Sequence, residues 1–143
     1  MKGKFTHILV PVSGQDVDKE ALQLACGIAK DNKSKIYVVY VIEVKRSLPL
    51  DAELEPEIHR AEEALRRAED IADMAEWEVK TDLLQAREAG PAIVDEAQEH
   101  NSDLIVMGVN YKRRFGEFHL GSNVPYVLKN APCHVLLLRQ PSP

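Results

Sequence analysis

Short apolar runs rich in β-branched residues alternate with amphipathic segments from one end of the chain to the other. The apolar runs predicted to be strands are residues 6–12, 35–42, 103–108 and 134–139, and residues 77–86, which alternate weakly, are predicted to be a further strand. Apolar residues recur at steps of three and four in residues 16–31, 57–75, a stretch that starts at Gly90 and Pro91, and 122–129. This alternation predicts a parallel sheet with right-handed crossovers and helices on both faces. We therefore expect an α/β fold of five strands and four helices, with any ligand bound beyond the carboxyl ends of the strands.

The breaks between these segments carry residues that start or stop helices. Asp16 follows the first strand and is a candidate N-cap for the first helix. Residues 43–56 include Pro49 and Pro56 and show no period, which predicts a surface loop. Pro91 fits the start of a helix, where a missing N–H costs little. No repeat or change of composition divides the chain, so we expect a single domain over residues 1–143.

Composition and charge narrow the class of protein. Of 143 residues, 45% are hydrophobic and 29% charged, and no stretch approaches the roughly 18 apolar residues of a membrane span. Residues 1–12 place two lysines before an apolar run, but Pro11 and the lack of a small-residue cleavage site favour a strand over a signal peptide. The net charge of -5 argues against a nucleic-acid-binding protein. We expect a soluble, cytoplasmic protein that neither inserts into membranes nor binds nucleic acid.

Residues that commonly hold metals or act as nucleophiles are scattered. Two cysteines, Cys26 and Cys133, favour free thiols of a reducing compartment over a disulfide. The histidines, which show no metal-ligand spacing, are His7, His59, His100, His119 and His134. Cys133 and His134 are neighbours on a strand and point to opposite faces, so they cannot form a joint chelate. No nucleophile-elbow pattern surrounds Ser13. We expect no metal site and no catalytic residue.

Residues 107–122, MGVNYKRRFGEFHLGS, have the character of a phosphate-binding loop that leads into a helix. Gly108 ends a short buried strand, and Gly121, Ser122 and Asn123 would begin the helix. The free N–H groups and positive dipole end of a helix attract anions, and Ser122 adds a hydroxyl. Positive charge could come from a basic run in the loop, Lys112, Arg113 and Arg114. The loop therefore predicts a site for a phosphate group.

Each of these residues also has a simpler structural interpretation. Gly108 could serve only as a turn at the end of a strand, and Ser122 could be a helix N-cap and nothing more. The basic run could be an exposed segment that favours solubility. Tyr111 could stack on a nucleotide base, or its ring could pack over an empty site. The sequence leaves these alternatives open.

Three segments together resemble the universal stress protein family: residues 8–14 (ILVPVSG), 103–108 (DLIVMG) and 121–135. They occur in the right order, and the resemblance covers the whole chain. It implies a doubly wound five-stranded parallel sheet of order 3-2-1-4-5 and a homodimer formed through the last strand. A long apolar edge strand is in any case a hazard unless something pairs with it. The dimer residues expected on this basis are Val135, Leu136, Leu137 and Leu138.

Many members of this family bind ATP through a G-x-x-G-x9-G-S/T pattern and an aspartate after the first strand. Gly108, Gly121 and Ser122 match the pattern, whereas Tyr111 stands at the second glycine and Ser13 at the aspartate. A tyrosine would be strained at positive φ or would block close approach of a phosphate. The nucleotide-binding residues expected from the resemblance are Pro11, Val12, Ser13, Val41, Met107, Gly108, Tyr111, Lys112, Arg113, Gly121, Ser122 and Asn123.

The resemblance implies a regulatory module of the stress response that binds an adenine nucleotide, ATP or AMP, in an atypical site and is not an enzyme. No Walker lysine and no Mg²⁺-binding carboxylate cluster accompanies the loop, so slow ATP hydrolysis is a weaker alternative. An alternative of another class is a dimeric interaction module that no longer binds nucleotide. Such a module would act on a protein partner, for example the cytoplasmic face of a membrane transporter.

Overall fold

Five parallel strands form the main sheet in the computed structural model, which describes residues 4–110, 113–114, 117–118 and 122–141. Their order across the sheet is β3-β2-β1-β4-β7. Their bounds are β1 His7–Pro11, β2 Lys35–Glu43, β3 Val79–Ala86, β4 Leu104–Val109 and β7 His134–Arg139. All four pairings within this sheet are parallel. Because β7 is the fifth strand of this sheet in chain order, the predicted order 3-2-1-4-5 is confirmed.

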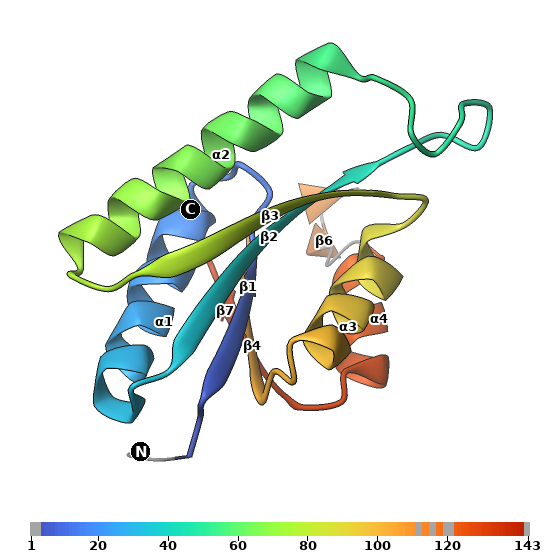
Figure 1. Cartoon of the computed structure of the whole chain (residues 1–143). Helices are drawn as coiled ribbons and strands as arrows, with labels where there is room; N and C mark the ends of the chain where they lie inside the picture. Colours follow the sequence, from blue (N-terminus) through green and yellow to red (C-terminus); the bar gives the residue numbers. More distant parts are fainter. Residues whose placement is uncertain (1–3, 111–112, 115–116, 119–121, 142–143) are drawn as a thin grey trace.

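Two helices cover each face of the sheet (Figure 1). Helices α1 (Val17–Asn32) and α2 (Glu55–Met74) lie on one face, and α3 (Ala89–Glu99) and α4 (Asn123–Asn130) lie on the other. Each connection between consecutive strands of the sheet passes through one of these helices. The predicted doubly wound architecture is therefore the one observed.

Successive residues of the central strands point into two separate cores. In β1, Ile8 and Val10 pack in the core under α1 and α2, whereas Leu9 packs in the core under α3 and α4. All three side chains are fully buried. Burying each one stabilises the fold by roughly 1.5–3 kcal/mol relative to leaving it in water. This two-sided burial explains why the strands are continuously apolar instead of alternating.

Helix α1 begins directly after Asp16, as predicted, but the polar contacts at its start differ from the expectation. Asp16 is the N-cap residue, has helical backbone angles and makes no side-chain capping hydrogen bond. The carboxylate of Asp18 instead accepts hydrogen bonds from the N–H groups of Ser13 (3.2 Å) and Gly14 (2.7 Å). Gly14 has a φ of +82°, a conformation that glycine adopts without strain, and the tight turn brings these N–H groups over the first turn of the helix. The expected N-cap position of Asp16 is therefore confirmed, but its side chain makes no capping hydrogen bond, and the carboxylate of Asp18 binds amides of the preceding turn.

Helix α2 also begins earlier than predicted. It starts at Glu55, so Pro56 lies in its first turn and not in the preceding loop. A proline is tolerated there because the first N–H groups of a helix have no intrahelical acceptor. The predicted loop is therefore shorter at both ends, since β2 continues through Glu43.

The loop between β2 and α2 is held by side chains from the end of β3. One guanidinium nitrogen of Arg87, Nη1, donates to the carbonyl oxygens of Lys45 (2.6 Å) and Leu48 (2.8 Å). The side-chain amide of Gln85 donates to the carbonyl oxygen of Leu50 at 2.9 Å. These hydrogen bonds hold residues 44–54, which form no helix or strand, in a fixed path between β2 and the first turn of α2.

A second, two-stranded sheet lies between β4 and α4 and was not predicted. Strand β5 (Arg113–Arg114) pairs antiparallel with β6 (Glu117–Phe118). Strands of two residues are too short to show a period in the sequence, which explains why only five strands were expected.

Two further observations bear on the expected class of protein. Cys26 is buried and Cys133 is half-buried, and both are free thiols, as predicted. In the described part of the chain, no helix has the length and apolar character that crossing a bilayer requires.

Candidate functional site

The carboxyl ends of β1 and β4 border the point at which the strand order reverses. From β1 the chain moves outward to β2 and β3, and it then returns to β4 and β7 on the other side of β1. The two crossovers depart in opposite directions, so the strand ends frame a crevice, which is where ligands bind in sheets of this kind. A cavity of about 630 Å³ lies there, lined by the ends of β1, β2 and β4 and by residues at the starts of all four helices.

Most of the residues predicted to bind nucleotide line this cavity. They are Pro11, Val12, Ser13, Val41, Met107, Gly108, Ser122 and Asn123. Tyr111, Lys112 and Gly121 lie outside the described residues, and Arg113 is described only as part of the backbone of β5. The structure thus brings together predicted residues that are more than a hundred positions apart in the sequence.

The cavity also contains polar residues that sequence reasoning missed. Glu43 comes from the end of β2, Glu57 and Arg60 from the first turns of α2, and Asn110 from the residue after β4. The Nη2 atom of Arg60 lies 3.2 Å from Oε1 of Glu57. No local sequence signal marks these residues. Glu57 and Arg60 line the cavity only because the loop before α2, which Arg87 and Gln85 hold, places the first turns of that helix beside it.

The turn after β1 offers fewer free donors than its sequence suggests. The N–H groups of Ser13 and Gly14 both point to the carboxylate of Asp18. Burial raises the pKa of Asp18, against the lowering effect of the hydrogen bonds from Gly14 and Ser13. Because these amides already have an acceptor within the protein, the hydroxyl of Ser13 is what this turn can offer to a ligand.

The amino terminus of α3 is likewise occupied by protein acceptors. Oε2 of Glu43 accepts a hydrogen bond from the N–H of Ala89 at 2.8 Å, and Oδ1 of Asn123 accepts one from the N–H of Gly90 at 3.1 Å. A Cβ at Gly90 would lie 3.1 Å from the Cβ of Tyr126, so the glycine allows α3 and α4 to approach closely. These hydrogen bonds connect α3 to β2 and α4. They also occupy the N–H groups of Ala89 and Gly90, which are then not available to bind an anion.

The amino terminus of α4 lacks a side-chain cap among the described residues. Ser122 occupies the N-cap position, as predicted, but its side chain makes no capping hydrogen bond. Its side chain is exposed and lines the cavity. The first N–H groups of a helix have no intrahelical acceptor, and the side chain of Ser122 does not accept a hydrogen bond from any of them. A hydroxyl and a helix terminus therefore face the cavity together and can receive a phosphate group.

Gly108 has a structural reason for being glycine. A Cβ added to it would lie 2.9 Å from both Cγ atoms of Val17, at the start of α1. Among the described residues Gly108 is not one of those with positive φ. Its small size is therefore required by the packing of α1 on β4, whether or not a ligand also approaches it.

Comparison with known proteins decides the family. The model of the universal stress protein family matches residues 4–139. The chain belongs to the universal stress protein family. A universal stress protein of Methanocaldococcus jannaschii is 35% identical over 145 residues, which cover 96% of this chain and 84% of the relative.

Solved structures of universal stress proteins share the fold. One from Archaeoglobus fulgidus superposes with a TM-score of 0.78 at 25% identity, covering 92% of this chain and 97% of that one. The structure of the Archaeoglobus fulgidus universal stress protein in complex with dAMP gives a TM-score of 0.73 at 26% identity, covering 92% and 96%. The predicted fold class and the predicted family are both confirmed.

The lining of the cavity includes both apolar and polar side chains. Val39, Val41 and Met107 supply apolar surface that can cover the faces of a planar ring. Ser122 and Asn123 supply polar groups at α4. The charged side chains among the described lining residues are Glu43, Glu57 and Arg60.

Proposed function

We propose that this chain is a cytoplasmic regulatory module of the stress response that binds an adenine nucleotide, ATP or AMP, and has no enzymatic activity of its own. The observation that carries the proposal is the cavity of about 630 Å³ at the reversal of strand order, lined by eight of the twelve residues predicted to bind nucleotide. A volume of this size falls within the usual range of about 300–1,000 Å³ for small-molecule sites.

The relative from Archaeoglobus fulgidus supports the choice of ligand. Its structure is of a complex with dAMP, and that protein is 26% identical to this one over 92% of this chain. In the proposed pose the purine lies against Val41 and Met107, and the phosphate group lies at Ser122 and the amino terminus of α4. The pose is atypical for the family, because Ser13 replaces an aspartate beside the adenosine part and Tyr111 replaces a glycine of the phosphate loop.

The decisive experiment is to denature freshly purified protein and to search the released material for an adenine nucleotide by chromatography and mass spectrometry. We expect a nucleotide at close to one equivalent per chain, or else micromolar binding of ATP or AMP to the empty protein in calorimetric titration. A matched variant, Val41→Trp, fills part of the cavity and should abolish both signals. If neither assay detects nucleotide in the wild-type protein, the proposal is wrong.

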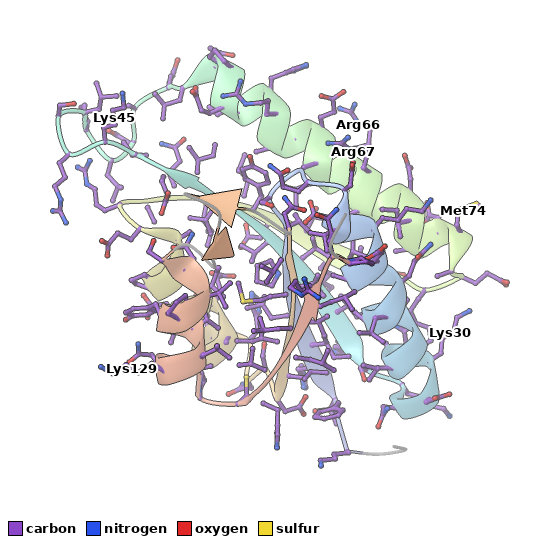
Figure 2. The ribbon with its side chains drawn as sticks, turned by 180° about the vertical axis from the view of Figure 1, so that it is seen from behind. Lys30, Lys45, Arg66, Arg67, Met74 and Lys129 are labelled. Carbon is purple, nitrogen blue, oxygen red and sulfur yellow. The ribbon has the colours of Figure 1, made fainter. Side chains whose placement is uncertain are left out.

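The position of β7 at one edge of the described sheet supports a second candidate function. Strand β7 is the last strand at one edge of the sheet. Its apolar residues are only half-buried: Val135, Leu136, Leu137 and Leu138. Seen from behind, β7 runs between α1 and α4 (Figure 2). We propose that this edge pairs with a second copy of the chain, because a long apolar edge strand otherwise invites aggregation.

A dimer of this kind could act without nucleotide, through a surface that binds a protein partner such as a membrane transporter. Failure of ATP, ADP and AMP to bind, together with co-purification of such a partner, would favour this function over nucleotide binding. Slow ATP hydrolysis is the third and weakest candidate. It requires Mg²⁺-dependent release of phosphate above the level of a Gly121 variant.

A further inference from the structure

Two carboxylates and an imidazole converge at the β3 edge of the sheet, on the face covered by α3. They belong to Asp82 on β3, to Glu96 on α3 and to His100, the C-cap residue of α3. One potential ligand atom from each residue lies within 4.8 Å of the other two. Figure 1 views the sheet from this edge, with α3 beside β3. None of the three residues is among those that line the nucleotide cavity.

The fold dictates this convergence. Glu96 and His100 are four residues apart, which places them on neighbouring turns of one helix face. Asp82 is the register partner of Val39, and Val39 packs in the core under α3 and α4. Register partners on adjacent strands point to the same face of a sheet, so the side chain of Asp82 also points toward α3. Three residues from two elements therefore meet through regular secondary structure and not through a loop.

The negative charge of this cluster is poorly compensated by the protein. Glu96 is only 7% exposed. Within the described part of the chain, no lysine or arginine forms an ion pair with Asp82 or Glu96. The nearest counterpart is Nε2 of His100, 3.1 Å from Oε2 of Glu96.

The imidazole of His100 is held in a fixed orientation. Its ring stacks on Tyr37 with a centroid distance of 4.0 Å and an interplanar angle of 14°. The ring of Tyr37, on β2, is also nearly parallel to the ring of His7, on β1, with a centroid distance of 6.4 Å and an interplanar angle of 5°. A ring clamped by stacking, with Nε2 directed at a carboxylate, loses little freedom when it binds an ion.

We propose that Asp82, Glu96 and His100 bind one divalent transition-metal ion, with Zn²⁺ the best match. Two carboxylate oxygens and one imidazole nitrogen suit Zn²⁺, Co²⁺ or Ni²⁺, whereas Mg²⁺ and Ca²⁺ prefer oxygen ligands alone. A dication would neutralise both carboxylates and replace the hydrogen bond between Glu96 and His100 with two metal bonds. Metal bonds of about 2.0–2.2 Å require the three ligand atoms to draw together, which rotation of the exposed Asp82 side chain can accomplish.

The sequence alone predicts no metal site, because its histidines and cysteines show no metal-ligand spacing. The Glu96-x3-His100 pair has helix spacing, but Asp82 lies on another element, and only the register of β3 against β2 brings it close. The simplest competing account is a cluster in which a proton shared by Glu96 and His100 relieves the repulsion and no metal binds.

The test uses the full-length chain without a histidine tag, freed of metal and nucleotide. Equilibrium dialysis against Zn²⁺, with metal measured by mass spectrometry, should give one ion per chain, and Co²⁺ should give a visible absorption band that Zn²⁺ displaces. Asp82→Asn and His100→Gln should each weaken Zn²⁺ binding by about tenfold or more. Uptake below one equivalent in the wild-type protein, or affinity unchanged in both variants, would overturn the proposal.

Two control variants remove similar groups outside the cluster. Glu99→Gln removes an exposed carboxylate from the same helix, and His59→Gln removes an exposed imidazole from α2; both should bind Zn²⁺ as the wild-type protein does. Asp82 is exposed on an edge strand, so Asp82→Asn should fold normally, and circular dichroism checks that it does. If His100→Gln unfolds through loss of its stack on Tyr37, the result with Asp82→Asn alone decides.

Discussion

Gly108 and Val17 lie so close together that a Cβ on the glycine would be 2.9 Å from both methyl carbons of the valine. A backbone oxygen of Val17 would also lie only 3.1 Å away. The first glycine of the family's nucleotide pattern is therefore also a packing residue, at the contact between β4 and the start of α1. Its presence is consistent with nucleotide binding but does not by itself demonstrate it.

Replacing Gly108 with alanine should destabilise the fold by about 1–3 kcal/mol, because the added methyl group overpacks a tight contact. In a Val17→Ala background the same substitution should cost less, since the two colliding methyl groups are gone. Denaturant unfolding of the wild-type protein, both single variants and the double variant measures this coupling. An equal cost of Gly108→Ala in both backgrounds would show that Val17 is not the residue that excludes a side chain.

Replacing Tyr111 with glycine should tighten the binding of ATP or AMP. Relief of about 1–3 kcal/mol of backbone strain, or of an equivalent steric block, corresponds to roughly a tenfold or greater gain in affinity. Calorimetric titration measures the gain, and Tyr111→Phe, which keeps the ring, should bind as the wild-type protein does. A loss of affinity in Tyr111→Gly would instead mean that the tyrosine contacts the nucleotide.

Replacing Leu138 with lysine should weaken the proposed homodimer without unfolding the chain. Leu138 pairs with Gly108 in the sheet but, unlike Leu136 and Leu137, is not packed against either core. A lysine on an exposed edge strand disfavours pairing with another edge. Analytical ultracentrifugation should show a dimer for the wild-type protein and a shift toward monomer for the variant. A monomeric wild-type protein would contradict the proposed pairing.

The carboxylate of Asp103 joins the starts of β1 and β4, and its contribution to stability should depend on pH. It accepts hydrogen bonds from the N–H of Thr6 (2.8 Å), the hydroxyl of Thr6 (2.8 Å) and the N–H of His7 (3.2 Å). Burial alone would raise the pKa of Asp103, but these hydrogen bonds lower it below the ordinary value of 3.8. The folded state therefore binds this proton less readily than the unfolded state does.

At neutral pH, Asp103→Asn should lower the free energy of unfolding by about 1–3 kcal/mol, because hydrogen bonds to a charged acceptor are lost. An acid whose pKa is lowered in the folded state stabilises that state above its unfolded pKa and ceases to do so as the pH falls through the folded pKa. The difference between the wild-type protein and the variant should therefore shrink below about pH 4. Denaturant unfolding at pH 7, 5 and 3 measures the trend, and a difference independent of pH would contradict it.

The parallel sheet could be predicted from the sequence because four of its strands are apolar runs and helices of clear period separate all five. The strand order and the cavity residues Pro11, Val12 and Met107 were instead expected from the resemblance to the universal stress protein family, and these residues do line the cavity at the ends of β1 and β4. The hydrogen bonds at helix starts were harder to predict. Asp16 and Asp18 both stand near the first helix, and the choice between them depends on the turn at Gly14, whose φ the sequence does not display.

The polar contacts that shape the cavity could not be predicted, because each joins residues distant in the sequence. Glu43 reaches the N–H of Ala89, and Asn123 reaches that of Gly90, only after β2, α3 and α4 have been placed. The cluster of Asp82 with Glu96 and His100 has the same origin, since it depends on the register of an edge strand. Local patterns specify the elements, whereas these contacts arise from their packing.

The two free thiols lie on opposite sides of the sheet, one in each core. Cys26 is buried in the core under α1 and α2, and Cys133 packs against the core under α3 and α4. The buried thiol of Cys26 can react with a small disulfide reagent only when its surroundings open, whereas the half-buried thiol of Cys133 is partly accessible in the folded chain. The labelling rate of Cys26 therefore reports how often α1 and α2 open from the sheet, Cys133 serves as an internal reference for the other face, and a bound ligand that stabilises the first core should slow the labelling of Cys26 alone.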